Sequence, residues 1–256
     1  MKLQIHQFLS KTGLFSSKEL IIRAIKKGEI TLDGKIVKNP KFDLNPKKRK
    51  VFYNKKNIDM LIDDIYIIIN KPQGYLSSKI TESDIQMSKK SVFELIKINE
   101  ELNELQKNSL FCVGRLDEDT SGLLVLTNDG KIGHRITNPN SNIKKKYYVE
   151  LKNELSDEDI KNIESGISIK LRIEDNTVYH DAKPAIIEKI ESYNYYITLT
   201  EGKKHEVKKI FEAVDNQVLE LKRTSIGEVN IKDLELEIGE YKFLEREFIM
   251  KYIFDE

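Results

Sequence analysis

The chain of 256 residues is 39% hydrophobic, which is enough for a substantial buried core. Its single cysteine, Cys112, cannot form an internal disulfide, and the N-terminus lacks the apolar segment of a signal peptide. The longest apolar run, near residues 65–69, is too short to cross a bilayer, so we expect a cytoplasmic protein that does not contact a membrane.

The net charge of +1 conceals an uneven distribution of charge along the chain. Residues 1–60 contain 15 Lys or Arg and 5 Asp or Glu, so the acidic excess lies in the remainder. Such asymmetry predicts a basic module that binds nucleic acid, attached to a body with another role. The alternative is a basic face that is merely solvated, as lysine-rich sequences often have.

The first sixty residues predict two helices followed by a hairpin. Apolar residues within 3–9 have helical spacing, and residues 16–19 (SSKE) read as a capping box that begins a second helix, which Gly28 ends. The pair Asp33-Gly34 between two apolar runs predicts a tight hairpin turn. We expect residues 51–53 to form a closing strand and residues 54–57 to form a linker.

This segment resembles the small RNA-binding domain named after ribosomal protein S-four, in which the second helix and the hairpin form a basic L-shaped surface. The resemblance is carried by Phe8-Leu9, Gly13, Ser16-Ser17-Lys18, Ile25-Lys26-Lys27-Gly28, Ile30, Leu32-Asp33-Gly34, Val37 and Pro40. It implies RNA contacts from five basic side chains, namely Lys18, Lys26, Lys27, Lys48 and Arg49. Lys18 stands where arginine is frequent, which keeps the charge but loses the bidentate geometry.

The rest of the chain predicts alternating strands and helices. Residues 64–70 read as a strand that runs into a tight loop. Further strands are predicted at 122–127, 146–151, 185–190, 195–199 and 218–223, and helices at 92–98, 157–164 and 205–214. This pattern predicts an α+β body.

The stretch 114–130 is the most informative part of the sequence. It is a polar, acidic turn between an apolar segment and an apolar strand. Such a loop can project Asp117 into a cleft as a nucleophile or base, with Arg115 nearby to engage phosphate or to keep the acid ionised. Asp119 and Thr120 could instead make this a purely structural loop. A metal site is not expected, because no metal-ligand spacing connects the acidic residues, Cys112, His6, His134, His180 and His205.

The same stretch resembles the active-site signature of pseudouridine synthases, and further segments resemble the RsuA-type group that modifies ribosomal RNA. The residues that carry this resemblance are Gly114 to Leu124 with Thr127 to Gly130, Lys71-Pro72, Gly74, Ser77-Ser78, Lys145, Tyr147, Val149, Lys183 to Ala185, Glu201 to Phe211, Val218, Leu221, Arg223 and Ile226-Gly227. Glu206 departs from the pattern, since glutamine is usual there, and a glutamate near phosphates is locally repulsive.

The resemblance implies three catalytic residues. Asp117 is the essential carboxylate. Tyr147 stacks on the uracil, although its alternation with Val149 also fits ordinary core. Lys208 pairs with Asp117 and keeps it ionised, although Lys204 and Lys209 are equally basic neighbours.

A second group of side chains is expected to contact RNA beside the site. These residues are Arg115, Lys203, Lys204 and His205, and the rival for Arg115 is a local ion pair with Glu118 or Asp119. The reaction class implies neither a cofactor nor a metal.

We therefore predict an α+β protein with an RNA-binding domain at residues 1–58 and a catalytic domain at 61–256, built on a mixed, largely antiparallel sheet. The predicted function is isomerisation of one uridine to pseudouridine in 16S rRNA by a monomer, on free rRNA or on a ribosome-assembly intermediate. Two alternatives stay open: the same chemistry on 23S rRNA, and a non-catalytic assembly factor that only binds RNA.

Overall fold

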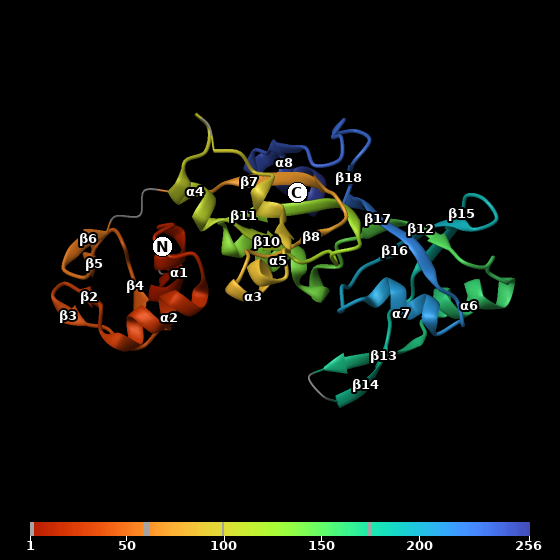
Figure 1. Cartoon of the computed structure of the whole chain (residues 1–256), viewed down its shortest axis with the longest axis horizontal. Coiled ribbons are helices and arrows are strands. Elements are labelled where there is room, and N and C mark those ends of the chain that lie inside the picture. The colour runs from red at the N-terminus through yellow and green to blue at the C-terminus, as the bar shows by residue number, and fades with distance from the viewer. Residues whose placement is uncertain (1–2, 59–61, 99, 174–175) are drawn as a thin grey trace.

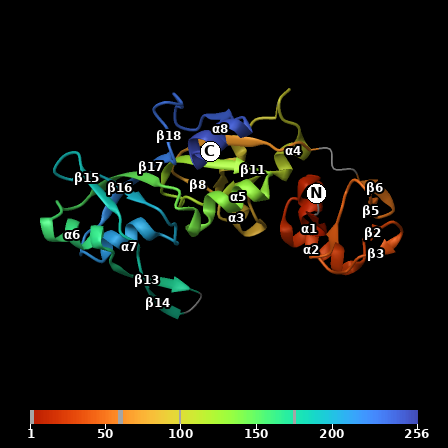
Figure 2. The same cartoon turned by 180° about the vertical axis from the view of Figure 1, so that it is seen from behind.

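The protein folds into a small N-terminal unit and a larger unit built around one long sheet (Figure 1). The structure is a computed structural model that describes residues 3–58, 62–98, 100–173 and 176–256. Seen from behind, the N-terminal unit and the helix labelled α6 lie at opposite ends of the molecule (Figure 2). Within the described residues, no helix combines the length and the apolar character that crossing a membrane requires.

The N-terminal unit has its own core. Its elements are β1 (Leu3–Gln4), α1 (Ile5–Lys11), α2 (Lys18–Lys27), β2 (Ile30–Leu32), β3 (Lys35–Ile36), β4 (Asp43–Leu44), β5 (Val51–Tyr53) and β6 (Lys56–Ile58). The buried face of α2 packs with apolar side chains of α1, β2 and β5 in a single cluster that runs from Ile5 to Ile58 along the chain. The next core cluster begins at Ile62, so the two units bury separate sets of side chains.

Local chemistry explains how these elements begin and end. The Ser17 side chain accepts a hydrogen bond from the Leu20 N–H and caps α2, and Gly28 ends the helix at φ +77°. The reciprocal bond of a capping box is absent here, because Leu20 occupies the position that needs a glutamate. Asp33 and Gly34 both have positive φ and form the predicted hairpin turn between β2 and β3.

The predicted linker at 54–57 is wrong. Asn54 and Lys55 both adopt positive φ, at 48° and 67°, and turn the chain back on itself. Lys56–Ile58 then forms β6, which pairs antiparallel with β5. The turn needs no glycine because asparagine tolerates the left-handed conformation, so its signal in the sequence is weak.

The larger unit contains the remaining elements. They are β7 (Tyr66–Lys71), β8 (Tyr75–Leu76), α3 (Glu82–Gln86), β9 (Lys90–Ser91), η1 (Val92–Glu94), α4 (Glu104–Ser109), β10 (Phe111–Val113), β11 (Ser121–Thr127), α5 (Gly130–Thr137), η2 (Pro139–Ser141), β12 (Lys145–Leu151), α6 (Asp157–Ser165), β13 (Ser168–Ile173), β14 (Asn176–Asp181), β15 (Ile186–Lys189), β16 (Asn194–Leu199), α7 (Glu206–Glu212), β17 (Val218–Ile226), β18 (Val229–Asn230), β19 (Tyr241–Phe243) and α8 (Arg246–Phe254).

Among the residues that the structure describes, the main sheet has nine strands. Its order is β15-β16-β12-β17-β11-β7-β19, with β10 paired to β11 and β18 paired to β17. Its pairings in the described residues are antiparallel except for β11 with β17. The predicted α+β class with a mixed, largely antiparallel sheet is therefore confirmed.

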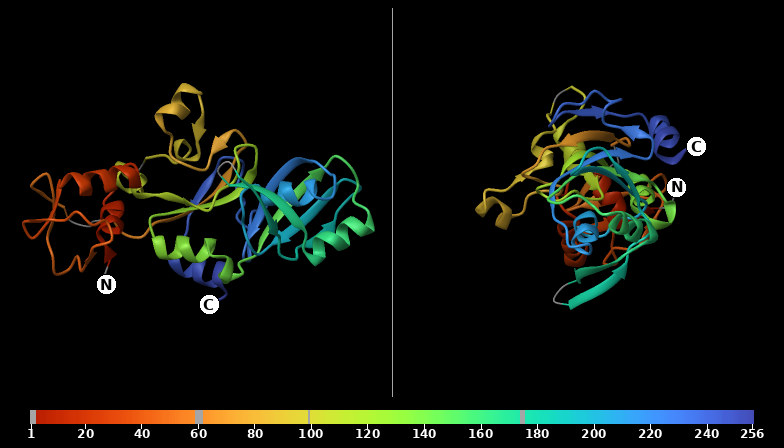
Figure 3. Two further views of the ribbon diagram at one scale, coloured as in Figure 1. Left: turned by 90° about the horizontal axis from the view of Figure 1, so that it is seen from below. Right: turned by 90° about the vertical axis from the view of Figure 1, so that its right-hand side faces the viewer.

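The central strands are covered on both faces. Ile67, Ile69 and Leu124 pack on one side, in a cluster that also contains Val92, Leu102 and Leu110. Tyr66, Ile68 and Leu123 face the other side and pack against α5 and α8, which lie side by side in Figure 3. Burial on both faces explains why these strands read as continuous apolar runs rather than as alternating patterns.

The predicted strands of the body are all present, and two of the three predicted helices are α6 and α7. The helix predicted at 92–98 is wrong, because only the 3-10 turn η1 forms there. Ser91 caps this turn, and Val92, Phe93 and Ile96 are all buried in the core. Burial of these side chains, and not their helical spacing, determines the path of the chain. The hairpin β13–β14 was not predicted.

The two units touch through α4. Lys11 forms an ion pair with Asp64, and the backbone of Gly13 abuts the carbonyl group of Leu105. A Cβ at Gly13 would lie 1.9 Å from that oxygen, and its φ is +66°. Glycine is therefore required at this contact for both space and conformation.

The parallel pairing of β11 with β17 is short and close. It joins Ser121 to Lys222 and Gly122 to Arg223. Gly122 has φ +107°, and a Cβ there would lie 2.2 Å from the carbonyl oxygen of Arg223. The two strands can meet at this point only because Gly122 has no side chain.

We expect Gly122→Ala to lower the free energy of unfolding by about 2–3 kcal/mol, because a Cβ forces β11 away from β17 and strains the backbone. Gly130→Ala is the matched control, since its Cβ would meet nothing within 4 Å and its backbone is helical. Urea denaturation of both variants measures the difference. Equal stability of the two variants would contradict this account of the junction.

Candidate active site

The loop at residues 114–120 connects two antiparallel strands and lies against the strand β17. Strands β10 and β11 are antiparallel, with Phe111 opposite Thr127 and Val113 opposite Val125. The loop therefore begins and ends at the same end of this strand pair. Gly114 begins it at φ +71°. Thr120 and Ser121 at its end are buried, whereas Asp117 stays partly accessible.

A buried lysine holds this loop from beneath. Lys71 is fully buried, and its Nζ donates to the carbonyl oxygens of Thr120 at 2.7 Å, Pro72 at 3.0 Å and Glu118 at 3.4 Å. Burial lowers the pKa of Lys71 to about 8, against the opposing effect of Asp119 and Asp117. The ammonium group therefore compensates backbone oxygens and acidic side chains of the same loop.

Two further contacts fix the loop to the chain that follows β7. The Gly74 N–H donates to the Glu118 carbonyl at 2.7 Å. The Ser77 hydroxyl donates to the Leu116 carbonyl at 2.7 Å and accepts from the Leu116 N–H at 3.1 Å. The lysine, glycine and serine singled out in the sequence at 71–78 are thus a support for the acidic loop.

The loop opens into a cavity of about 340 Å³, within the range that holds small ligands. It is lined by side chains of the loop, of β12, of β17 and of the segment before α7. They include Arg115, Asp117, Lys145, Tyr147, Lys203, Lys204, His205, Glu206 and Arg223. Four of the six basic residues among them, Arg115, Lys203, Lys204 and His205, are exposed at the surface.

Asp117 faces a histidine across this cavity. Its side chain is 23% exposed, and Oδ1 lies 3.3 Å from Nε2 of His205. His205 adopts the left-handed conformation, with φ +57°, immediately before α7. This conformation is uncommon for a residue other than glycine, and it turns the ring toward the acidic loop.

Tyr147 and Arg223 are neighbours across the β12–β17 ladder. Tyr147 is 8% exposed, belongs to the core cluster and also lines the cavity. Its position therefore fits both interpretations of the sequence, a core residue and a residue of the site. The Arg223 Nε donates to the Leu123 carbonyl at 2.7 Å, which links β17 to β11. Its Nη2 is buried and has no hydrogen-bond partner among the described residues.

The family comparisons agree with this architecture. The sequence matches the model of the RNA pseudouridylate synthase family over residues 65–213 and that of the S4 domain over residues 5–50. The first match covers more than half of the chain. The chain belongs to the RNA pseudouridylate synthase family. It is therefore an isomerase that acts on RNA, and the predicted enzyme class is confirmed.

Individual relatives of this synthase match it over nearly its whole length. It is 37% identical over 249 residues to an uncharacterized RNA pseudouridine synthase of Bacillus subtilis, which covers 96% of each chain. It is 34% identical over 237 residues to ribosomal small subunit pseudouridine synthase A of Escherichia coli, covering 93% of this chain and 94% of the relative. A solved pseudouridylate synthase superposes with a TM-score of 0.64 at 29% identity and covers 98% of this chain and 100% of its own.

Of the seven site residues predicted in the larger unit of the synthase, the structure brings six together, and Lys208 is the exception. Asp117, Tyr147, Arg115, Lys203, Lys204 and His205 line the same cavity. The predicted ion pair of Lys208 with Asp117 is wrong. Lys208 Nζ instead contacts Asp119 Oδ2 at 2.5 Å, which holds the pKa of Asp119 below its usual range although burial alone would raise it.

The physical reason for this correction lies in the geometry of α7. His205 precedes the helix and reaches Asp117, whereas Lys208 lies one turn farther along and pairs with Asp119. A second hollow lies beside these side chains and is lined by Asp117, Asp119, His205 and Lys208 among others. The catalytic role of Lys208 stays a prediction. The sequence analysis named His205 only as an RNA contact and assigned no role to Arg223 or Lys145. Both of these residues line the cavity because β12 pairs with β17, which has no local signal in the sequence.

The basic residues predicted in the N-terminal unit are exposed. Lys18, Lys26 and Lys27 lie on α2, and Lys48 lies in the loop before β5. Arg49 forms an ion pair with Asp33 of the hairpin turn, so part of its charge is already compensated. The rival pairing of Arg115 with Glu118 is not formed, since Glu118 bonds to Lys89 at 2.7 Å.

We expect the kcat/KM of the synthase to fall as the pH rises through about 8. Burial, assisted by Arg223, lowers the pKa of Lys145 in the cavity to about 8, so its positive charge is present at pH 7 and lost above pH 8. Lys145→Met should be roughly tenfold less efficient at pH 7, as expected for loss of one charged contact to RNA, and should decline less between pH 7 and 9. Kinetics of pseudouridine formation across this range measure both effects.

Lys144→Met is the control for this experiment, because Lys144 is an exposed neighbour that does not line the cavity. It should keep the wild-type pH profile. A Lys145→Met enzyme with an unaltered profile would contradict the assignment of the high-pH decline to Lys145.

Proposed function

We propose that this synthase converts a uridine of 16S rRNA to pseudouridine and that Asp117 supplies the reacting carboxylate. The observation that carries the chemistry is the position of Asp117, which projects from a rigidly supported loop into a cavity lined by Tyr147, His205 and Arg223. The substrate is supported by two relatives named ribosomal small subunit pseudouridine synthase A, from Escherichia coli and from Yersinia pestis, at 34% and 32% identity.

The reaction requires little apparatus. The bond between uracil N1 and the sugar carbon breaks, the base turns, and C5 joins the same sugar carbon. C5 then loses its proton, and N1 takes up a proton. The product is an isomer of the substrate, so no net oxidation or reduction takes place. Asp117 can attack the sugar carbon, add to the base, or remove a sugar proton on a glycal path, and all three remain open.

The neighbours of Asp117 have distinct physical roles in this proposal. His205 Nε2, at 3.3 Å, orients the carboxylate and stabilises its charge. Tyr147 presents an aromatic ring to an extruded uracil, which is a common way to hold a base out of its stack. Arg223 offers its unpartnered Nη2 to a carbonyl or phosphate oxygen of the substrate.

The exposed basic side chains provide the electrostatic attraction. Arg115, Lys203 and Lys204 surround the cavity, and α2 carries further lysines at the end of the molecule. Phosphate contacts at two separated places would hold an RNA that spans both units. The proposed enzyme acts as a monomer in the cytoplasm, on free rRNA or on an assembly intermediate of the small subunit.

We expect Asp117→Asn to reduce the rate of pseudouridine formation by roughly 10³-fold or more, because the amide is neither a nucleophile nor a base. Asp119→Asn is the matched control in the same loop. It loses only an exposed ion pair with Lys208 and should change the rate by less than about tenfold. Single-turnover assays on rRNA measure both, and a fully active Asp117→Asn enzyme would end the mechanistic proposal.

We expect the purified enzyme to form pseudouridine in 16S rRNA and not in 23S rRNA. Both rRNAs should be prepared without modifications and supplied free or as assembly intermediates, with pseudouridine mapped by chemical labelling and primer extension. Conversion of 23S rRNA alone would favour the alternative substrate. Binding of rRNA without any conversion would favour a non-catalytic assembly factor.

We expect the combined change of Lys18, Lys26 and Lys27 to Ala to weaken RNA binding and to reduce its dependence on salt. Each lost phosphate contact lowers the slope of log affinity against log salt by roughly 0.9 on duplex and 0.7 on single-stranded nucleic acid, so the slope should fall by about 2–3. Lys152, Lys161 and Lys232, which are exposed outside α2, form a control set of equal charge. An unchanged slope in the α2 variant would remove α2 from the RNA-binding surface.

A further inference from the structure

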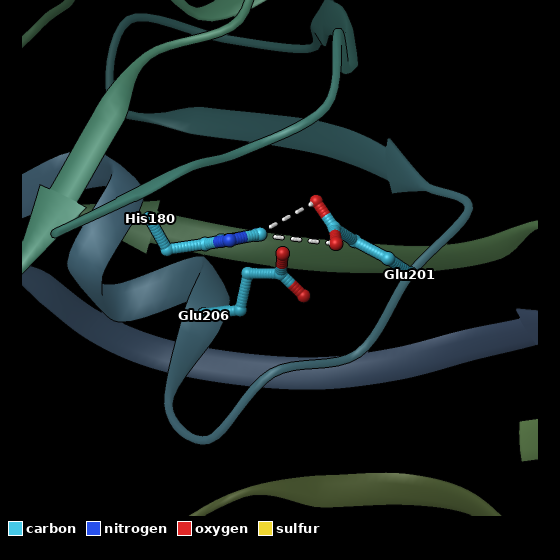
Figure 4. Close-up of side chains that lie close together, drawn as sticks. All are labelled: His180, Glu201 and Glu206. Atoms are coloured by element: carbon cyan, nitrogen blue, oxygen red, sulfur yellow. Dashed lines mark hydrogen bonds and ion pairs between the residues drawn. The ribbon is translucent and has the colours of Figure 1, made fainter. Parts of the chain in front are cut away.

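Three titratable side chains lie close together beside the segment that precedes α7. His180 comes from β14, Glu201 follows β16, and Glu206 is the first residue of α7. The ring nitrogen of His180 and one carboxylate oxygen from each glutamate all lie within 4.8 Å of one another. Figure 4 shows the two carboxylates and the imidazole edge directed toward a common point.

The two carboxylates are buried side by side. Glu201 and Glu206 are each 4% exposed. Glu201 Oε1 accepts the Lys183 N–H at 2.8 Å, and Glu206 Oε2 accepts the Lys203 N–H at 2.7 Å. Glu206 Oε1, however, has no hydrogen-bond partner among the described residues.

This arrangement is unfavourable unless the two carboxylates share a proton or bind a cation. Two carboxylates in a site of low dielectric repel each other, and a buried oxygen without a partner is destabilising. Burial raises the pKa of Glu206 to about 7, and the charge of Glu201 adds to the shift. Burial also acts on Glu201, but the Lys183 N–H, the neighbouring Glu206 and His180 outweigh it and keep the pKa of Glu201 below the usual range.

The donor set matches the preferences of a borderline transition metal. His180 Nε2 lies 3.2 Å from Glu201 Oε2. Two ligands that each lie about 2.1 Å from a tetrahedral zinc ion are separated by about 3.4 Å. His180 is 26% exposed, so its side of the cluster leaves room for a water as a fourth ligand.

We propose that His180, Glu201 and Glu206 form a structural binding site for a divalent transition-metal ion, with Zn²⁺ as the best fit. The ion bridges the β13–β14 hairpin to the segment 201–206, which carries Lys203, Lys204 and His205 at the cavity. Its role is to fix that segment, and no step of the isomerisation passes through it. The site departs from the sequence-based expectation of no metal, because its ligands come from two places more than twenty residues apart.

The test is metal binding by the full chain after treatment with a chelator. Zn²⁺ should bind with a stoichiometry of one in competition with a chromophoric chelator and should raise the melting temperature. Glu206→Gln keeps the bond to the Lys203 N–H but removes the ligand charge, and it should weaken Zn²⁺ binding at least about 100-fold. His180→Gln should do the same, and it changes a hairpin residue that is partly exposed.

Two control variants match these substitutions in chemistry. Glu212→Gln alters an exposed glutamate on the same helix, and His134→Gln alters an exposed histidine on α5, so both should bind Zn²⁺ like the wild type. Circular dichroism verifies that each variant is folded.

Two outcomes would overturn the proposal. Absence of stoichiometric Zn²⁺ binding by the wild type would mean that the carboxylates share a proton instead. Binding that survives both Glu206→Gln and His180→Gln would place the ion elsewhere, for example at Asp117 and His205. These results are independent of whether 16S rRNA is the substrate.

Discussion

The candidate active site of this protein depends on the close approach of two backbones at Gly122. At that point β11 leaves the acidic loop and runs parallel to β17, with the glycine directly opposite Arg223. Because Arg223 also faces Tyr147 across the next ladder, one pairing aligns the loop of Asp117 with the aromatic ring and the guanidinium group. A side chain at Gly122 would separate these strands and displace the groups that line the cavity.

Charge compensation keeps the acidic loop in this position. Three consecutive acidic residues, Asp117 to Asp119, would repel one another on a flexible turn. Each has its own partner: His205 for Asp117, Lys89 for Glu118 and Lys208 for Asp119. Lys71 beneath the loop adds a cation that bonds to backbone oxygens rather than to side chains. Asp117 is thereby left with the partner that also faces the cavity.

Positive charge is distributed between two functions. In the N-terminal unit the lysines of α2 are exposed, so they remain available to phosphates, whereas Lys71 and Arg223 are buried in the larger unit and serve the architecture of the site. The net charge of the whole chain hides this division, because the larger unit offsets the basic surface with acidic residues. Electrostatic steering of RNA depends on the local surface and not on the total.

The sequence by itself determined the elements whose cause is local. Ser17 caps α2, Gly28 ends it, Asp33-Gly34 makes the hairpin turn, and continuous apolar runs mark the central strands, since each feature acts within a few residues of itself. The long acidic motif, through its resemblance to a known family, predicted Asp117 as the reacting carboxylate. Only the tertiary structure decided that His205 rather than Lys208 faces Asp117, that Arg223 lies beside the cavity, and that His180 meets Glu201 and Glu206. These contacts join segments far apart in the chain. They depend on the register of the strands and on the direction of α7, and neither has a signal in the local sequence.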